Sequence, residues 1–184
     1  ESGTMEAQPL SVGTILKNRY RITRLVAGGG MAWVYEVVED LADGRRRVWA
    51  MKELRADGSD PQAVQEGRQL FEQEANILVT LNHPNLPKVA AFFEDAGKVF
   101  LVMDFVQGES LAKRLEHAGA PILESIVLDW SVQICEVLEY LHTRQPPVIF
   151  RDMKPSNVMV TPSGRIMLID FGIARTYKLG KRKD

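Results

Sequence analysis

Short runs of alternating polar and apolar residues, separated by turn signals, fill the first part of the chain and restrict what it can fold into. Residues 19–26 alternate with the period of a half-buried β-strand. The glycines at 28–30 interrupt the alternation and residues 34–38 resume a β-prone sequence, which predicts two strands joined by a glycine-rich turn. A turn signal at 43–44 leads to another such run at 48–52. Successive strands joined by short turns predict an antiparallel sheet.

A single helix interrupts this series of strands. Residues 55–66 combine a glycine, a proline and alternating charges without periodicity, so we expect a loop there. Residues 69–81 carry apolar side chains at spacings of three, four and seven, which predicts an amphipathic helix. Two more strand-like runs follow at 86–93 and 98–104. The first part of the chain therefore predicts a five-stranded antiparallel sheet with one helix.

Helical patterns replace the strands in the second part of the chain. Ser110 is a suitable N-cap for a short helix that ends near His117. A longer helix is predicted over 122–142, with an apolar stripe that consists of Val127, Trp130, Ile134, Val137, Leu138 and Leu141. Short apolar strands are expected at 158–160 and 166–169. Strands first and helices later define an α+β fold with segregated halves.

Composition excludes several classes of protein. Of 184 residues, 45% are hydrophobic and 26% are charged, and no apolar run could span a bilayer, so fibrous, disordered and membrane-spanning chains are excluded. The formal net charge of −1 indicates neither a nucleic-acid partner nor a membrane surface.

A single cysteine and the lack of a signal-peptide pattern predict a cytoplasmic protein. Because Cys135 lies beside the stripe of the long helix, we expect a buried thiol. Residues 1–4, ahead of Met5, have the character of a cloning remnant.

The residues that say most about chemistry lie in two short segments near predicted strand ends. Residues 150–157 are Phe-Arg-Asp-Met-Lys-Pro-Ser-Asn, and residues 170–172 are Asp-Phe-Gly. Together they supply two carboxylates, an amide and a lysine. Such a set suits transfer from a metal-bound nucleotide, because it offers oxygen ligands for Mg²⁺, a base for a hydroxyl nucleophile and a cation for phosphate charge.

The order Arg-Asp-x-Lys-x-x-Asn followed by Asp-Phe-Gly resembles the catalytic loop and metal-binding motif of the protein kinases. Residues 29–35, Gly-Gly-Met-Ala-Trp-Val-Tyr, resemble in particular the bacterial Ser/Thr protein kinases of eukaryotic type. The resemblance covers roughly residues 19–178. It implies a kinase-like α+β architecture with an N-terminal extension at 5–18, an N-lobe at 19–103, a hinge at 104–107, a partial helical C-lobe at 108–172 and the start of an activation loop at 173–184.

This resemblance implies a role for each polar residue of the two segments. Asp152 would be the catalytic base that takes the proton of the substrate hydroxyl, and Lys154 would face the transferred phosphate. A lysine two residues after the base, with Pro155 next, is the form found in Ser/Thr kinases. Asn157 and Asp170 would bind the metal ions that bridge the β- and γ-phosphates.

A lysine on the third strand would complete the phosphate site. Strand alternation puts Ala50 on the same face as Lys52, and a small side chain there leaves room for a flat ring. The resemblance implies that Lys52 contacts the α- and β-phosphates and pairs with Glu74 on the first helix.

The remaining nucleotide contacts are also implied by the resemblance. They are Val26, Ala27, Gly28, Gly29 and Gly30 in the glycine loop, Val34, Ala50 and Met159 around adenine, Met103 beside the deeper pocket, and backbone groups of Asp104 and Val106 in the hinge. The loop departs from the Gly-x-Gly-x-x-Gly pattern, because alanines stand at its first and last positions and only Gly29 fits. Neighbouring glycines keep the backbone flexible, so we expect nucleotide binding to survive.

The function that follows from the resemblance is ATP- and Mg²⁺-dependent phosphorylation of protein serine and threonine. Neither an Ala-Pro-Glu motif nor the helices that follow it occur at 173–184, so the resemblance implies a catalytic domain truncated after Asp-Phe-Gly. An uncovered apolar face on the 122–142 helix would then favour self-association. The alternative is a kinase-fold module that binds ATP or a partner without useful turnover. A small-molecule phosphotransferase is disfavoured by Lys154-Pro155.

Overall fold

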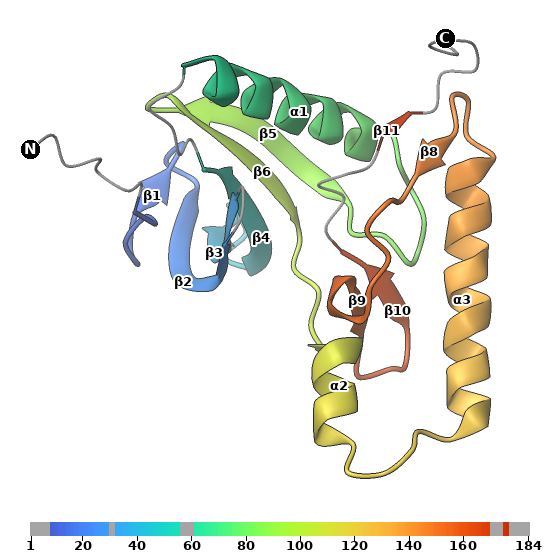
Figure 1. Cartoon of the computed structure of the whole chain (residues 1–184). Helices are drawn as coiled ribbons and strands as arrows, with labels where there is room; N and C mark the ends of the chain where they lie inside the picture. Colours follow the sequence, from blue (N-terminus) through green and yellow to red (C-terminus); the bar gives the residue numbers. More distant parts are fainter. Residues whose placement is uncertain (1–7, 30–31, 56–60, 170–174, 177–184) are drawn as a thin grey trace, which may run out of the picture. The chain divides into compact units, whose positions relative to one another are not determined.

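The computed structural model describes residues 8–29, 32–55, 61–169 and 175–176. In chain order the elements are β1 (Ile15–Leu16), β2 (Tyr20–Gly29), β3 (Ala32–Asp40), β4 (Arg46–Leu54), α1 (Pro61–Val79), β5 (Val89–Asp95), β6 (Lys98–Asp104), β7 (Glu109–Ser110), α2 (Leu111–His117), α3 (Glu124–His142), β8 (Val148–Ile149), the 3₁₀ turn η1 (Pro155–Asn157), β9 (Val158–Val160), β10 (Ile166–Leu168) and β11 (Arg175–Thr176) (Figure 1). They fall into two compact units, Glu1–Ala75 with Val89–Phe105 and Asn76–Lys88 with Val106–Asp184.

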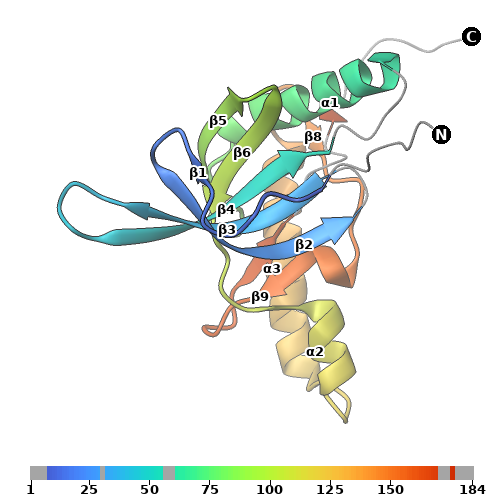
Figure 2. The same ribbon diagram turned by 90° about the vertical axis from the view of Figure 1, so that its left-hand side faces the viewer.

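A six-stranded antiparallel sheet dominates the first unit, in the order β1-β2-β3-β4-β6-β5. Figure 2 shows the long hairpin through which β3 leads into β4. The α+β class is confirmed, and each of the five predicted strands is present. The sheet has six strands, so the predicted number is one too few. The additional strand, β1, pairs Ile15 with Arg21 and Leu16 with Tyr20. Two residues are too few to show alternation, so the sequence pattern could not indicate this strand.

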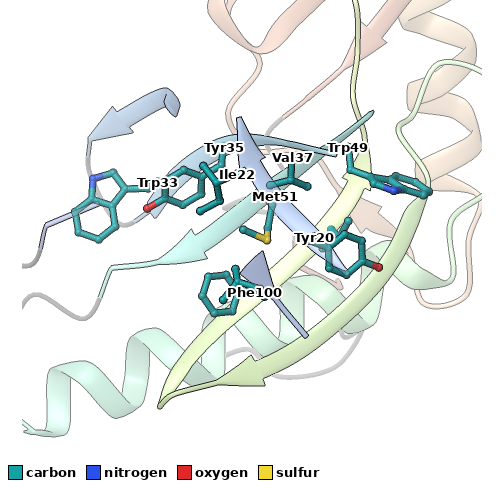
Figure 3. Packing of buried hydrophobic residues seen from close by; sticks show 10 residues of the cluster. Tyr20, Ile22, Trp33, Tyr35, Val37, Trp49, Met51 and Phe100 are labelled. Atoms are coloured by element: carbon teal, nitrogen blue, oxygen red, sulfur yellow. The ribbon is translucent and has the colours of Figure 1, made fainter. Parts of the chain in front are cut away.

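The core of the first unit lies on one face of this sheet. Because side chains alternate between faces, every second residue of each strand points to this face, and these residues meet those of the neighbouring strands. The cluster consists of Leu16, Tyr20, Ile22, Trp33, Tyr35, Val37, Trp49, Met51, Phe100 and Val102 (Figure 3). The ring of Phe93 packs between those of Tyr20 and Phe100, with centroid distances of 5.9 and 5.3 Å. Each large apolar side chain buried here stabilises the fold by roughly 1.5–3 kcal/mol.

Helix α1 begins earlier than predicted. The expectation of a loop over 55–66 is wrong for 61–66, because α1 starts at Pro61. Proline suits the first position of a helix, since its missing N–H would have no partner there and its φ is already helical. Farther along α1, the ring of Phe71 lies 6.2 Å from that of Phe92 on β5, and Arg68 forms an ion pair with Glu94. These contacts attach the helix to the edge strand β5.

Two helices and short strands build the second unit. The predicted cap of α2 is confirmed, because Ser110 Oγ accepts a hydrogen bond from the Lys113 amide at 3.3 Å. Of the predicted stripe on α3, Trp130, Val137 and Leu141 are buried. The expectation of a buried Cys135 is wrong, because this residue is exposed. A helix turns by about 100° per residue, which rotates Cys135 away from its neighbour in the stripe.

Part of the apolar surface of α3 is open in the described chain. Ile126, Val127, Leu128 and Val132 are each at least 41% exposed. Val127 belongs to the predicted stripe, so the stripe is buried over only part of its length. Self-association through this surface stays a prediction.

One asparagine ties three segments of the second unit together. The Nδ2 atom of Asn85 donates to the Ile166 carbonyl at 2.6 Å and to Gln133 Oε1 at 3.1 Å. The Asn85 carbonyl accepts from the Leu168 amide at 2.9 Å. The loop between α1 and β5 is thereby bonded to both α3 and β10.

A glycine allows two backbone segments of this unit to approach closely. Gly108 has φ +143°, and a Cβ at this position would lie 2.2 Å from the Val160 carbonyl oxygen. Only glycine fits both the backbone angle and the space. The approach accompanies the pairing of β7 with β9, in which Glu109 lies opposite Val160.

Candidate active site

The first unit brings Lys52 and Glu74 together. The Nζ atom of Lys52, on β4, donates to Oε1 of Glu74, on α1, at 3.0 Å. Their side chains are only 13% and 7% exposed, so the pair is largely removed from water. The ammonium also lies 5.7 Å from the centre of the Phe71 ring. Charge and ring together hold the lysine at one place beside the sheet.

Three other predicted nucleotide contacts share the sheet face of Lys52. The register pairs Val34 with Lys52 and Ala50 with Met103. Because Ala50 lies two residues before Lys52 on the same strand, both side chains leave the same face. All four residues are half-buried. This face therefore offers an apolar surface that ends in an ammonium group.

At the end of β6, Asp104 is bonded to the neighbouring strand. Arg47 Nη2 donates to Asp104 Oδ1 at 3.3 Å, and the Arg47 guanidinium lies 3.8 Å from the centre of the Trp49 ring. The boundary between the two compact units follows Phe105 and precedes Val106, within the segment predicted as the hinge.

The glycine segment closes the far end of β2. Val26, Ala27 and Gly28 are exposed, and Gly28 pairs with Trp33. A Cβ on Gly28 would lie 3.0 Å from the Trp33 ring, so this glycine makes room for the indole. Gly29 is the last residue of β2, and the prediction for Gly30 lies outside the described residues.

In the second unit, three of the predicted catalytic residues contact one another. Lys154 Nζ lies 2.7 Å from Asp152 Oδ2, and Asn157 Nδ2 donates to the same oxygen at 3.0 Å. The Asn157 amide group also donates to the Asp152 carbonyl at 2.9 Å. The hydrogen bond from Lys154 lowers the pKa of the Asp152 carboxyl, and that from Asn157 adds to the effect against the opposing cost of burial. Asp152 is therefore an anion at neutral pH, oriented by two donors.

The backbone of Asn157 is held by hydrogen bonds as well. Asn157 ends the 3₁₀ turn η1, its amide donates to the Lys154 carbonyl at 2.9 Å, and its carbonyl accepts from the Ile169 amide at 3.0 Å. Ile169 directly precedes Asp170 in the sequence, and Asp170 itself lies outside the described residues. Met159 follows on β9, half-buried, opposite Met167 of β10.

Three buried polar residues were absent from the sequence predictions, and the first of them, Glu39, is 4% exposed. Glu53 is 1% exposed and Asn85 is 5% exposed. For Glu53 a signal existed, because it follows Lys52 in a strand and so occupies the face that alternation assigns to the core. A charged residue on that face must have buried partners. Asn85 gave no comparable signal, since it lies between predicted elements.

Among the described residues, no group of three histidine, cysteine or acidic side chains could hold a metal ion by itself. No helix in the described ranges is long and apolar enough to cross a membrane.

Comparison with known proteins adds sequence and fold similarity. A family model described as the protein kinase domain matches residues 20–184. The chain is 36% identical over 170 residues to serine/threonine-protein kinase PknA of Mycobacterium tuberculosis (strain H37Rv), covering 89% of this chain and 37% of that protein. It is 34% identical over 167 residues to probable serine/threonine-protein kinase PknB of Lactococcus lactis, covering 90% and 25%.

The chain thus spans no more than 37% of the length of these two relatives. Among solved structures, PpkA-294 in its apo form matches with a TM-score of 0.79 and 23% identity, over 90% of this chain and 62% of that chain. At that identity the match is a likeness of fold.

Proposed function

This chain belongs to the protein kinase family, and we propose that it transfers the γ-phosphate of ATP to serine and threonine hydroxyls of protein substrates. The predicted kinase-like fold and the relation to bacterial Ser/Thr kinases are confirmed. Lys154 and Pro155, which follow Asp152 closely, support a preference for serine and threonine.

The arrangement around Asp152 is the observation that carries the proposal. Its carboxylate is ionised and held by Lys154 and Asn157, so it can accept the proton of a substrate hydroxyl. As the hydroxyl oxygen forms a bond to the γ-phosphorus, the bond from that phosphorus to the bridging oxygen of ADP breaks, and ADP leaves. The ammonium of Lys154 would offset negative charge on the transferred group.

Lys52 would act on the other phosphates. Its ammonium would bind the α- and β-phosphates, and the ion pair with Glu74 would keep it extended along the sheet face. Val34, Ala50 and Met103 would contact the adenine ring and the space behind it, which agrees with their place on the Lys52 face. We assign the backbone of Asp104 and Val106, the glycine segment from Val26 to Gly30 and Met159 to the same nucleotide, as the sequence predicts.

Asn157 fits the metal that this family implies. Because its Nδ2 donates both hydrogen bonds to Asp152, Oδ1 is the amide atom that would bind the ion, and Mg²⁺ prefers such oxygen ligands. Asp170 would be the second ligand. When bound, Mg²⁺ supplies positive charge to the β- and γ-phosphates.

Transfer of radiolabel from ATP to a generic protein substrate tests the proposal. We expect label on serine and threonine with the wild-type chain and a loss of at least about 100-fold in Asp152→Asn, since the base is gone. Asp129→Asn is the matched control. It makes the same chemical change at an exposed carboxylate of α3 that bonds only to a glutamine amide in the described contacts, and it should retain full activity.

Label equal in the wild type and in Asp152→Asn contradicts phosphotransfer by this site. If the wild type and Asp152→Asn both bind ATP in the presence of Mg²⁺ but neither transfers label, the chain is a nucleotide-binding module instead. Loss of activity in Asp129→Asn as large as in Asp152→Asn would mean that the assay reports folding.

A further inference from the structure

The segment that precedes the family match is bonded along the sheet of the first unit. The family model begins at residue 20, whereas residues 10–16 already contact the sheet. The Gly13 amide donates to the Ile22 carbonyl at 2.8 Å, and the Thr14 carbonyl accepts from the Ile22 amide at 2.9 Å. Leu16 is buried in the core cluster, and Leu10 packs against it. We call residues 8–16 the N-terminal segment.

This segment also reaches a buried polar network. The Leu10 amide donates to the Tyr35 hydroxyl at 2.9 Å, and that hydroxyl donates to Glu53 Oε2 at 2.6 Å. Lys98 Nζ donates to the other oxygen of Glu53 at 2.5 Å. Tyr35 is fully buried and Glu53 is 1% exposed, so this carboxylate depends on its protein donors.

The direction of the hydrogen bonds links the segment to Glu53. A hydroxyl has one hydrogen, and the Leu10 N–H occupies a lone pair of the Tyr35 oxygen, which leaves the hydroxyl hydrogen for Glu53. Burial and then the bond to Glu53 raise the pKa of the Tyr35 hydroxyl, so it remains a donor across the physiological range. Two partners orient the Tyr35 hydroxyl, the Leu10 amide and the Glu53 carboxylate. Without the Leu10 amide, only Glu53 remains to orient it.

Glu53 directly follows Lys52 on β4. The two side chains leave opposite faces of the strand, and the same backbone carries both. Fixing Glu53 on the core face therefore fixes the backbone from which Lys52 extends toward Glu74. Phe100 and Leu101 of β6 pair with Glu53 and Lys52, which extends the constraint to the neighbouring strand.

We infer that the N-terminal segment is a positioning element of the nucleotide site, acting through Tyr35 and Glu53 on the part of β4 that bears Lys52. The inference rests on the proposed role of Lys52 in binding ATP. It assigns function to residues outside the family match, and none of them contacts the nucleotide in this scheme.

Four single variants and one double variant test this link. Tyr35→Phe removes the hydroxyl and keeps the ring, and Leu10→Pro removes the amide hydrogen. Leu10→Ala is the control for the lost side chain, because it keeps the amide. Val12→Pro is the control for a proline in the segment. Val12 occupies the second position of a turn with Gly13 at φ +91°, where proline is favoured.

Hydrogen exchange without nucleotide gives the first readout. Tyr35→Phe and Leu10→Pro should accelerate exchange of the amides of β4, residues 46–54, whereas Leu10→Ala and Val12→Pro should leave β4 within about two-fold of the wild type. The double variant Tyr35→Phe with Leu10→Pro should equal the stronger single variant, because both break one chain of hydrogen bonds.

Nucleotide binding and kinetics give the second readout. The Kd for Mg-ATP and the KM for ATP should rise by about three- to ten-fold in Tyr35→Phe and Leu10→Pro, as expected for one buried hydrogen bond, with the KM for the protein substrate unchanged. A purely structural role would lower the melting temperature without this selective change.

Unchanged β4 exchange in Tyr35→Phe and Leu10→Pro, or faster exchange confined to residues 8–16, overturns the inference. Equal rises of KM for both substrates would also overturn it. If the wild-type chain binds no Mg-ATP, the proposed function fails, and the exchange experiment still decides whether the segment holds β4.

Discussion

The ammonium of Lys52 donates to the carboxylate of Glu74 across 3.0 Å, and this bond joins the middle of the sheet to helix α1. Both groups are nearly buried, so the ion pair helps to compensate the charge of each. Surface ion pairs on the same helix matter less, because water replaces a lost partner. The pair should therefore affect both stability and nucleotide binding.

Glu74→Gln should lower the stability of the chain by about 3 kcal/mol, since it removes the carboxylate from a largely buried ion pair. It should also weaken Mg-ATP binding by about ten-fold, because Lys52 is no longer held along the sheet face. Urea unfolding and calorimetric titration measure the two effects. Glu72→Gln changes a half-exposed pair with Arg68 on the same helix and should shift stability by less than about 0.5 kcal/mol. Equal effects of the two substitutions would contradict this account.

Gly108→Ala should be strongly destabilising. The added Cβ would meet the Val160 carbonyl oxygen at 2.2 Å, and the φ of +143° is unfavourable for any other residue. We expect a loss of about 2–4 kcal/mol, and a melting temperature lowered by roughly 5–15 °C. Gly67→Ala is the matched control, because Gly67 lies in α1 with open space around it and should gain about 0.5–1 kcal/mol. Normal stability of Gly108→Ala would mean that β7 and β9 separate readily.

Lys154→Gln should raise the pKa of Asp152, since the hydrogen bond from Lys154 is the main cause of its lowering. A carboxylate with a lowered pKa stays ionised as the pH falls, so Asp152, the proposed base, should become protonated at a higher pH in the variant than in the wild type. Carbon-13 NMR of labelled aspartate measures the titration directly, and the acidic limb of the pH–rate profile should move in the same direction. Lys113→Gln, on α2, is the control. An unchanged Asp152 titration in Lys154→Gln would refute the assignment.

His83 should make the chain less stable in mild acid. Burial lowers the pKa of this imidazole, with Glu136 opposing the effect, and its Nδ1 accepts a hydrogen bond from the Asn85 amide at 3.1 Å. The folded state therefore binds a proton less readily than the unfolded chain. The contribution of neutral His83 to the free energy of unfolding is complete above about pH 6.5 and declines as the pH falls below that value.

Urea unfolding between pH 7 and 5 measures this decline. His83→Gln should show a flatter pH dependence than the wild type. A slope that is the same in the wild type and in His83→Gln would exclude His83 as its source.

Much of the fold could be predicted because the strands show the expected alternation of polar and apolar residues, and turn residues separate them in the sequence. The predicted strand at 34–38 is part of β3, in which buried Tyr35 and Val37 alternate with half-buried Val34 and Glu36. The start of α1 could not be predicted in the same way, because its first residues are exposed or half-buried and carry no apolar period. The first turn of α1 is stabilised mainly because the helix continues into its packed part. The prediction assigned Pro61 to a loop, although proline also suits the first position of a helix.

The site shows a similar division. The proximity of Lys52 to Glu74, and that of Asp152 to Lys154 and Asn157, followed from a known order of motifs. Alternation could have indicated the burial of Glu53 but not its partners, because Tyr35 and Lys98 lie far from it in sequence and meet it only in the folded sheet. Long-range partners of a buried charge are set by register, which a single sequence does not reveal.

The bonds of Asn85 have a consequence for how the second unit opens. Since one residue bonds to α3 through Gln133 and to β10 through Ile166 and Leu168, the loop, the long helix and the β9–β10 hairpin cannot separate one at a time without leaving a buried amide group unpaired. They should therefore exchange their amide hydrogens in a single cooperative event, with one opening free energy. Because β10 pairs with β9, strain applied to the loop at Asn85 reaches the strand that directly follows Asn157.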